Sequence, residues 1–349
     1  MGAEDTSTQS HSIKSVALTG ATGFVGKRLI PLLLDAGFNV RALTRRPQTL
    51  NHKNLTWVEG DLQNDTALTS LTKNVDAIIH MAGLVKALRR ADFISVNDGG
   101  TENLIKALKT QAKENAGSKK EGRGSSAVKK TDGVQKPFFI HVSSLAAREP
   151  SLSHYAYSKH LSEQTVKDAL PDGGYCIIRP PAVYGPGDEE FQKVLDPMLK
   201  LGLAPKAGFG DSRFSLIYVD DLARALIKAL KAPPMADIYE LDDFGHDQHH
   251  HGYNTGQLKN IVTSFSGRSV MTITMPKTLI YLLGYLGSLW AQLTRKPAML
   301  THKKAAEICH PNWVVNHQSL QSFMDQTSWS PSTTLEKGLA KTLGERSNI

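Results

Sequence analysis

Short apolar runs alternate with longer amphipathic segments through the first half of the chain. Runs of this length, rich in β-branched residues and separated by helical patterns, are typical of parallel strands covered by helices on both faces. Six strands are expected: residues 15–18, 39–43, 56–59, 76–80, 138–142 and 175–178. The pattern therefore predicts a doubly wound α/β fold.

The alternation is interrupted twice. Residues 114–136 are polar and basic and are expected to form a solvent-exposed insertion. After residue 185 the pattern becomes less regular, which indicates a smaller C-terminal α/β lobe made of 186–211 and 233–349. Within this region, an apolar strand at 214–219 and the helix after it, in 212–232, are expected to return to the first domain, 13–185. Residues 1–12 are polar and are expected to be disordered.

Three glycines at three-residue spacing, Gly20, Gly23 and Gly26, follow the first strand and open a helix. Glycines allow a tight turn and bring backbone amides close to a pyrophosphate, and the helix N-terminus adds partial positive charge. This context predicts a Rossmann-type dinucleotide site. The residues expected to hold the cofactor here are Gly20, Thr22, Gly23, Phe24 and Val25.

The end of the second strand bears on the choice of cofactor. An acidic residue there would accept hydrogen bonds from the adenosine ribose of NAD, but the chain has Thr44, Arg45 and Arg46. Two guanidinium groups suit the 2′-phosphate of NADP(H) better than the free hydroxyl of NAD(H). A solvated basic loop is the alternative interpretation.

Two further strand ends are expected to face the cofactor. Asp61 and Leu62 follow the third strand, and Ala82 and Gly83 follow the fourth. Ligands of such sheets bind at the carboxyl ends of the strands. Asp61 either accepts from the adenine amino group or is an ordinary acidic turn residue.

Candidate catalytic residues lie on the helix after the fifth strand. Tyr155 and Lys159 are four residues apart and share a helix face, whereas Tyr157 points elsewhere. A phenol with a pKa of about 10 needs a nearby cation to act in acid-base chemistry at neutral pH, and the ammonium of Lys159 can be that cation. The fifth strand ends in Ser143 and Ser144, and we favour Ser144 as the hydroxyl that binds a substrate carbonyl.

Together these motifs resemble the extended short-chain dehydrogenase/reductases, the superfamily that includes epimerases and dehydratases acting on nucleotide sugars. The ordered matches include the glycine turn, Tyr155 with Lys159, 179–185 and 218–221. The resemblance implies that Ser144, Tyr155 and Lys159 are catalytic, that Lys159 also holds the nicotinamide ribose, and that Pro180 and Val183 flank the nicotinamide. It also implies a C-terminal lobe that closes over a small-molecule substrate.

Departures from the family pattern order the functional hypotheses. Dehydratases carry an acid and a base beside the catalytic hydroxyl, whereas Ser144 is followed by Leu145, Ala146 and Ala147, so a dehydratase is disfavoured. The first hypothesis is an NADP(H)-dependent oxidoreductase acting on a carbonyl or alcohol. A nucleotide-sugar epimerase and a non-catalytic NADP(H)-binding assembly subunit are the alternatives.

Composition adds few constraints. The 349 residues carry a net charge of +8 and two distant cysteines, which form neither a disulfide framework nor a metal motif. Without a secretory pattern at the N-terminus, a cytoplasmic location is expected. Residues 278–293 are apolar but too short for a membrane span, and peripheral membrane contact is left open without being favoured. A homodimer is also left open, no nucleic-acid module is seen, and the histidines at 246 and 249–251 are interpreted as a polar loop rather than a metal site.

Overall fold

A seven-stranded parallel sheet forms the centre of the molecule. The computed structural model describes residues 13–121, 137–232, 235–244, 252–294, 298 and 300–344. The sheet has the order β11-β6-β5-β4-β1-β2-β3, and every neighbouring pair is parallel. Its strands are β1 (Ser15–Thr19), β2 (Asn39–Thr44), β3 (Leu55–Glu59), β4 (Ala77–His80), β5 (Phe138–Val142), β6 (Tyr175–Arg179) and β11 (Ala236–Glu240). The order reverses between β1 and β4, which is where such sheets bind ligands.

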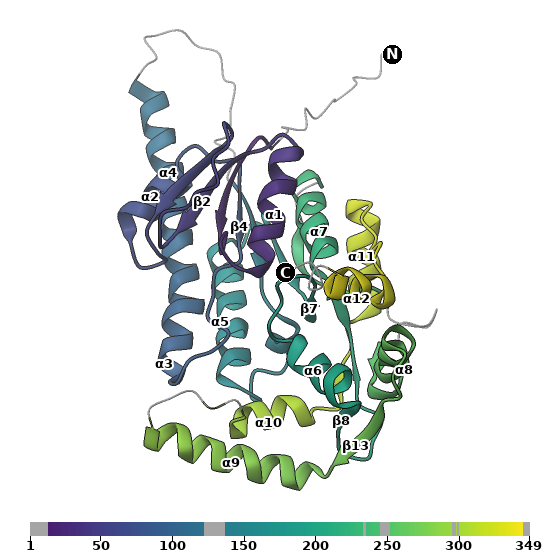
Figure 1. Cartoon of the computed structure of the whole chain (residues 1–349). Helices are drawn as coiled ribbons and strands as arrows, with labels where there is room; N and C mark the ends of the chain where they lie inside the picture. Colours follow the sequence, from purple (N-terminus) through teal and green to yellow (C-terminus); the bar gives the residue numbers. More distant parts are fainter. Residues whose placement is uncertain are drawn as a thin grey trace, which may run out of the picture.

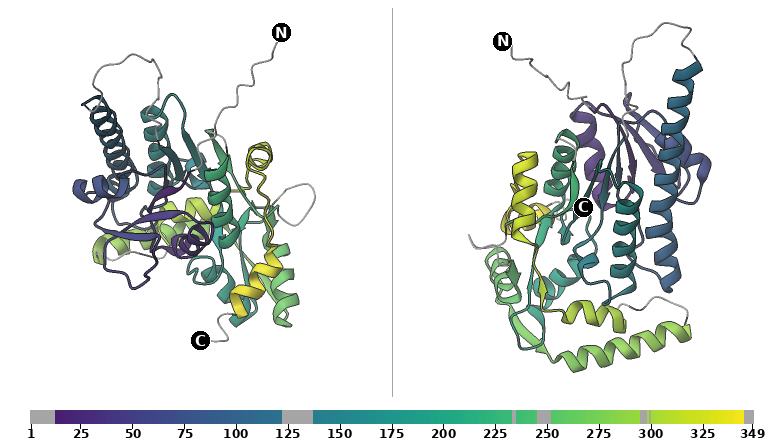
Figure 2. Two further views of the ribbon diagram at one scale, coloured as in Figure 1. Left: turned by 90° about the horizontal axis from the view of Figure 1, so that it is seen from above. Right: turned by 180° about the vertical axis from the view of Figure 1, so that it is seen from behind.

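Helices cover both faces of this sheet (Figures 1 and 2). One face carries α1 (Phe24–Asp35), α7 (Val219–Lys231) and α11 (His317–Thr327), and the other carries α2 (Asp65–Thr72), α4 (Gly100–Glu121) and α5 (His154–Ala169). The sheet separates two hydrophobic cores, and successive residues of β1 pack into different ones. Val16 and Leu18 belong to one core, and Ala17 belongs to the other. Burial on both faces explains why the strands are continuous apolar runs.

The smaller lobe consists of short sheets and helices at the carboxyl edge of the main sheet (Figure 1). Its sheets pair β7 (Ala182–Tyr184) with β10 (Leu216–Tyr218), β8 (Leu203–Ala207) with β13 (Met271–Met275), and β9 (Arg213–Phe214) with β12 (Tyr253–Asn254) and β14 (Asn312–Trp313). Its helices are α6 (Gln192–Asp196), the π-helix η3 (Pro197–Leu201), α8 (Thr255–Ser266), α9 (Lys277–Thr294), α10 (His302–Cys309) and α12 (Leu335–Gly344).

The predicted doubly wound α/β fold is confirmed, and its six predicted strands match β1 to β6 to within one residue at each end. Two elements of the predicted smaller lobe, 233–349, belong with the main sheet instead: β11 is its seventh strand, and α11 packs against β11 and α7. The first residues of β11 are exposed and its last two are buried, which fits a strand at the sheet edge that pairs with β6 on one side.

Two segments also differ from their predicted form. The strand expected at 214–219 is divided, since β9 ends at Phe214 and β10 begins at Leu216, and these strands join different small sheets. The predicted insertion at 114–136 overlaps α4, whose helix continues to Glu121. The remainder of that insertion, the N-terminal residues 1–12 and the histidines at 246 and 249–251 lie outside the described residues.

Candidate active site

The glycine turn joins the end of β1 to the start of α1. Gly20 has φ +74°, and a Cβ there would lie 2.9 Å from the amide nitrogen of Ala82, so the position requires glycine. A Cβ on Gly26 would overlap the backbone of Gly20 and Ala21, which explains why α1 can pack so close to the strand. The turn exposes Thr22 and Gly23 and half-buries Phe24 and Val25.

The amino end of α1 is suited to an anion. Its N-cap, Gly23, offers no side-chain cap, and the first turn contains no acidic residue. The backbone amides in the first turn of α1 can therefore donate hydrogen bonds to a bound anion, and the helix dipole favours a negative charge there. A bare, positively polarised turn at the switch point of the sheet fits a dinucleotide pyrophosphate.

A buried histidine fixes the loop after β4 against this turn. The Nδ1 of His80 lies 2.7 Å from the Thr19 hydroxyl, and its Nε2 lies 2.9 Å from the Thr101 hydroxyl. Thr19 Oγ1 in turn accepts from the amides of Met81 and Ala82. Burial, and secondarily the Lys159 ammonium, lower the pKa of His80 to about 3, so the ring is neutral.

Asn97 positions the next part of the same loop and was not singled out as a site residue. Its side chain accepts from the Leu84 amide at 2.6 Å and donates to the Leu84 carbonyl and to the Ser158 hydroxyl. A Cβ on Gly83 would lie 2.9 Å from the Asn97 side-chain oxygen, so this glycine permits the approach. Asn97 lies in the π-helix η1 (Ile94–Gly99), and its burial as a polar residue was not visible in the sequence.

Tyr155 and Ser144 meet at the carboxyl edge of the sheet. Burial raises the pKa of Tyr155 above its usual value, and the neighbouring Ser144 side chain opposes this shift in part. The Tyr155 ring contacts Phe93 edge-on, with ring centroids 6.3 Å apart. Tyr157 instead lies beneath the Arg90 guanidinium, 4.2 Å from the ring centre. The structure thus places Tyr155, and not Tyr157, beside Ser144.

Ser143 is turned away from Tyr155 into a buried charged network. Its hydroxyl donates to Glu163 at 2.5 Å, and Glu163 forms a two-point ion pair with Arg179, at 2.6 and 2.9 Å. Arg179 also reaches Glu240 on β11 at 3.5 Å. Ser143 therefore connects β5 to α5 and β6, whereas Ser144 is left at the edge of the sheet.

Lys159 lies one helical turn after Tyr155 and is buried. Its Nζ donates to the carbonyl of Val142, the last residue of β5, at 2.9 Å. Burial lowers the pKa of Lys159 to about 8, against the opposing effect of Glu163, so most of its population carries a positive charge at neutral pH. Lys159 therefore lies against the end of β5, two residues before Ser144, and on the same helix as Tyr155.

The predicted adenosine residues lie at the ends of β2 and β3. Thr44 is buried and donates to the carbonyl of Arg46 at 2.7 Å, which shapes a turn that leaves the Arg45 and Arg46 side chains exposed. Asp61 accepts from the amide of Gln63, and Leu62 is buried against Gly100. These side chains line the same carboxyl edge as the glycine turn.

The smaller lobe contributes to the other end of the site. The carbonyl of Pro180 accepts from the Leu145 amide at 2.9 Å, which joins the loops after β5 and β6, and Val183 follows on β7. From α10, the charge of Glu307 reaches Tyr155 and contributes to its raised pKa. Glu307 was not predicted as a site residue, because nothing in the sequence around it shows that α10 lies near Tyr155 on α5.

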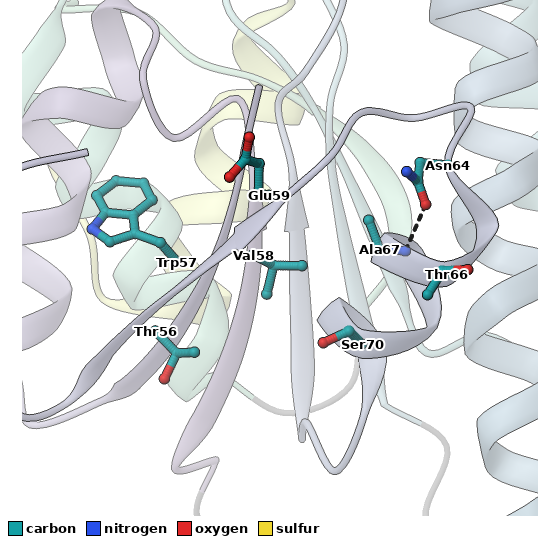
Figure 3. A pocket seen from close by; sticks show the side chains of 8 residues that line it. All are labelled: Thr56, Trp57, Val58, Glu59, Asn64, Thr66, Ala67 and Ser70. Atoms are coloured by element: carbon teal, nitrogen blue, oxygen red, sulfur yellow. Dashed lines mark hydrogen bonds between the residues drawn. The ribbon is translucent and has the colours of Figure 1, made fainter. Parts of the chain in front are cut away.

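A separate hollow lies at the outer edge of the main sheet, between β3 and α2 (Figure 3). Its lining includes Trp57, Glu59 and Asn64, and Asn64 caps α2 through the Ala67 amide. None of the predicted site residues lines it. Within the described ranges, no group of three or more histidine, cysteine, aspartate or glutamate side chains could hold a metal ion.

The sheet, the glycine turn and the tyrosine-lysine helix define a class: nucleotide-dependent oxidoreductases of Rossmann type, with a substrate lobe at the carboxyl edge. A family model for the NAD dependent epimerase/dehydratase family matches residues 16–241. The chain belongs to this family, within the extended short-chain dehydrogenase/reductases, and its cofactor is an NAD(P) nucleotide.

Curated relatives cover most of the chain. It is 34% identical to the ceramide reductase of Caulobacter vibrioides, over 85% of each chain. It is 24% identical to the 2-alkyl-3-oxoalkanoate reductase of Stenotrophomonas maltophilia, over 93% of this chain and 97% of that one. Among solved structures, MoeE5 in complex with UDP-glucuronic acid and NAD superposes with a TM-score of 0.66 at 18% identity, over 96% and 100% of the chains, and shows the shared fold.

Proposed function

We propose that the protein is an NADPH-dependent reductase that converts the ketone of a long-chain substrate to a secondary alcohol. The observation that carries the proposal is the position of Tyr155 and buried Lys159 one helical turn apart on α5, with Lys159 bound to the Val142 carbonyl and Ser144 two residues further along. These three groups are the ones that carbonyl reduction needs at one edge of the sheet.

In this proposal Tyr155 is the acid and Ser144 orients the oxygen. Because the pKa of Tyr155 is raised, its hydroxyl is protonated at neutral pH and can donate to the substrate oxygen. When bound, NADPH would supply a hydride to the carbonyl carbon. As the C=O π electrons move to oxygen, Tyr155 would give that oxygen its proton. Lys159 then stabilises the resulting phenolate by its charge until a solvent proton restores it.

Arg45 and Arg46 support NADPH over NADH. Both are exposed at the carboxyl end of β2, where Thr44 shapes the turn, and neither position offers a carboxylate to a ribose hydroxyl. Guanidinium groups bind phosphate through charge-assisted hydrogen bonds. A 2′-phosphate would therefore have two candidate partners at this turn.

The proposed substrate class is supported by the relatives. Two relatives that match most of this chain are named for a ceramide and for a 2-alkyl-3-oxoalkanoate, and both of these compounds carry alkyl chains. We therefore expect an amphiphile whose ketone lies near its polar end, such as a ceramide with its secondary alcohol oxidised.

The test is product formation by the purified protein with NADPH, using a ketoceramide and, in parallel, UDP-glucose. Alcohol formed in step with NADPH consumption is the expected result. Conversion of UDP-glucose without added cofactor would instead make the protein an epimerase. Tight NADPH binding with no turnover of any ketone, and wild-type behaviour of Tyr155→Phe, would favour an assembly subunit.

A further inference from the structure

Helix α9 (Lys277–Thr294) forms the outermost layer of the smaller lobe and presents apolar side chains to solvent. It runs along the base of the molecule with α10 above it, in both side views (Figures 1 and 2). Leu286 is 52% exposed, Trp290 64% and Leu293 83%. The exposed large apolar side chains of the helix are Leu279, Tyr281, Leu282, Leu283, Tyr285, Leu286, Leu289, Trp290 and Leu293.

The face of α9 that packs against the rest of the smaller lobe is narrow and includes two glycines, Gly284 and Gly287. Ile280 and Gly284 are its buried residues, and a Cβ on Gly284 would press against Thr301 and Ala305. Gly287 meets the backbone of Leu300 in the same way. At 100° per residue, Leu282, Leu286, Leu289 and Leu293 fall on the opposite side of the helix. The largest apolar side chains thus point away from the protein core.

The distribution of charged residues along α9 indicates whether a partner helix or a membrane surface better fits its exposed face. Residues 278–294 contain no charged residue, so the leucines are flanked by Tyr285, Trp290 and other apolar or aromatic side chains. A two-helix seam buries a narrow stripe and is usually flanked by charged residues, whereas this apolar arc is broad and uncharged. Aromatic residues beside leucines are typical of helices that lie in a membrane interface.

The sequence around α9 is rich in basic residues, although one of them, Lys304, forms an ion pair with Glu307 at 2.9 Å. The sequence from 248 to 306 contains seven lysines and arginines and no aspartate or glutamate: Lys259, Arg268, Lys277, Arg295, Lys296, Lys303 and Lys304. Each basic residue close to an anionic lipid surface contributes about 1 kcal/mol of attraction. No described helix is long and apolar enough to cross a bilayer, so the helix would lie on the surface.

We propose that the outer face of α9 docks on the surface of an anionic lipid bilayer, with Leu286, Leu289, Trp290 and Leu293 inserted among the lipids. Exposed Ile273 lies on β13, just before α9 in the chain, and exposed Phe209 follows Gly208, which lies against Lys277 at the amino end of the helix. This surface lies one helix away from the site, because α9 packs on α10 and the charge of Glu307 on α10 reaches Tyr155. The docking would bring the site of a long-chain reductase to a membrane that contains its substrate, but the docking itself does not depend on the reaction.

Vesicle sedimentation of the full-length protein tests this proposal without any turnover. The probes are vesicles of phosphatidylcholine alone and of phosphatidylcholine with phosphatidylglycerol. We expect binding to the anionic vesicles, weakened by high salt, and a fall in the partition coefficient of at least about tenfold in the double variant Leu286→Glu/Leu293→Glu. Leu50→Glu, an exposed leucine in the nucleotide domain, is the matched control and should bind like wild type.

Equal binding of the double variant and wild type, or no wild-type binding to anionic vesicles, would overturn the proposal. A concentration-dependent dimer in analytical ultracentrifugation that the double variant abolishes would assign the face to a second copy and overturn it as well. Both leucines are exposed, so the variants should keep the wild-type melting temperature. Quenching of Trp290 by brominated lipids, absent in Trp290→Phe, would supply independent support.

Discussion

The two serines at the end of β5 have different surroundings, although they are neighbours in the sequence. Ser144 lies beside Tyr155 and accepts from the Ala146 amide, while Ser143 donates to the buried carboxylate of Glu163. The sequence could identify the pair and favour Ser144, but it could not show the charged network that engages Ser143. That network connects residues from β5, α5, β6 and β11, which are distant along the chain.

Replacing each serine by alanine should therefore have opposite consequences. Ser144→Ala should lower kcat for ketone reduction by about tenfold to a thousandfold, because a hydrogen bond to the developing oxyanion is lost. Ser143→Ala should leave kcat close to wild type but cost about 1–3 kcal/mol of unfolding free energy, because Glu163 loses a buried donor. Kinetics and urea titration of both variants check this. Equal losses of kcat would contradict the assignment.

Arg45 gives a second prediction at the residue scale. Arg45→Ala should weaken NADPH binding by roughly tenfold to a hundredfold, the value of a hydrogen bond between charged groups, and leave NADH binding unchanged. Nicotinamide fluorescence titrations of wild type and variant measure both affinities. NADH affinity equal to or higher than NADPH affinity in the wild type would remove the basis for the NADP assignment and favour an epimerase.

At the scale of elements, β4 and β5 carry two stacked, buried histidines in the centre of the sheet. The rings of His80 and His141 have centroids 5.3 Å apart. Burial is the main cause that lowers both pKa values, that of His80 to about 3 and that of His141 well below its usual value. Nε2 of His141 lies 3.0 Å from the Ser162 hydroxyl, which connects β5 to α5.

Acid should therefore destabilise the protein before the carboxylates titrate. Both histidines are neutral when folded and ionise near 6.5 when unfolded, so the unfolded state binds more protons as the pH falls below 6.5. Between pH 7 and about 5, His80 should cost roughly 2 kcal/mol of unfolding free energy, and His141 should add to this loss. Urea titrations over this range measure the loss, and His141→Asn should show a smaller pH dependence than the wild type. A flat profile would mean that the rings are protonated in the folded state.

The strands and helices show which parts of the fold and of the site could be predicted from the sequence and which could not. The six strands were predicted because short apolar runs alternate with helical segments along the first half of the chain, and the glycine turn was predicted because it follows β1. β11 was missed because its half-exposed pattern at the sheet edge is not such a run. Glu307 and Asn97 were missed because tertiary packing, and not local spacing, brings them to the site.

At the scale of the whole molecule, the two lobes have separate roles in the proposed reaction. The seven-stranded sheet holds the proposed cofactor turn and α5, and the smaller lobe adds α10, whose Glu307 acts on Tyr155, and α9 at the base (Figure 1). The smaller lobe could be located from the loss of regular alternation after residue 185. Its internal pairings, such as β8 with β13, connect segments that are distant in sequence and could not be inferred.

The central claim is that Tyr155 provides the proton for ketone reduction by NADPH. The most direct measurement compares wild type, Tyr155→Phe and Tyr157→Phe for alcohol formation from a ketoceramide with NADPH. Tyr155→Phe should lose about a hundredfold to ten-thousandfold in kcat while still binding NADPH, and Tyr157→Phe should stay near wild type. Full activity in Tyr155→Phe, or a comparable loss in Tyr157→Phe, would contradict the assigned chemistry.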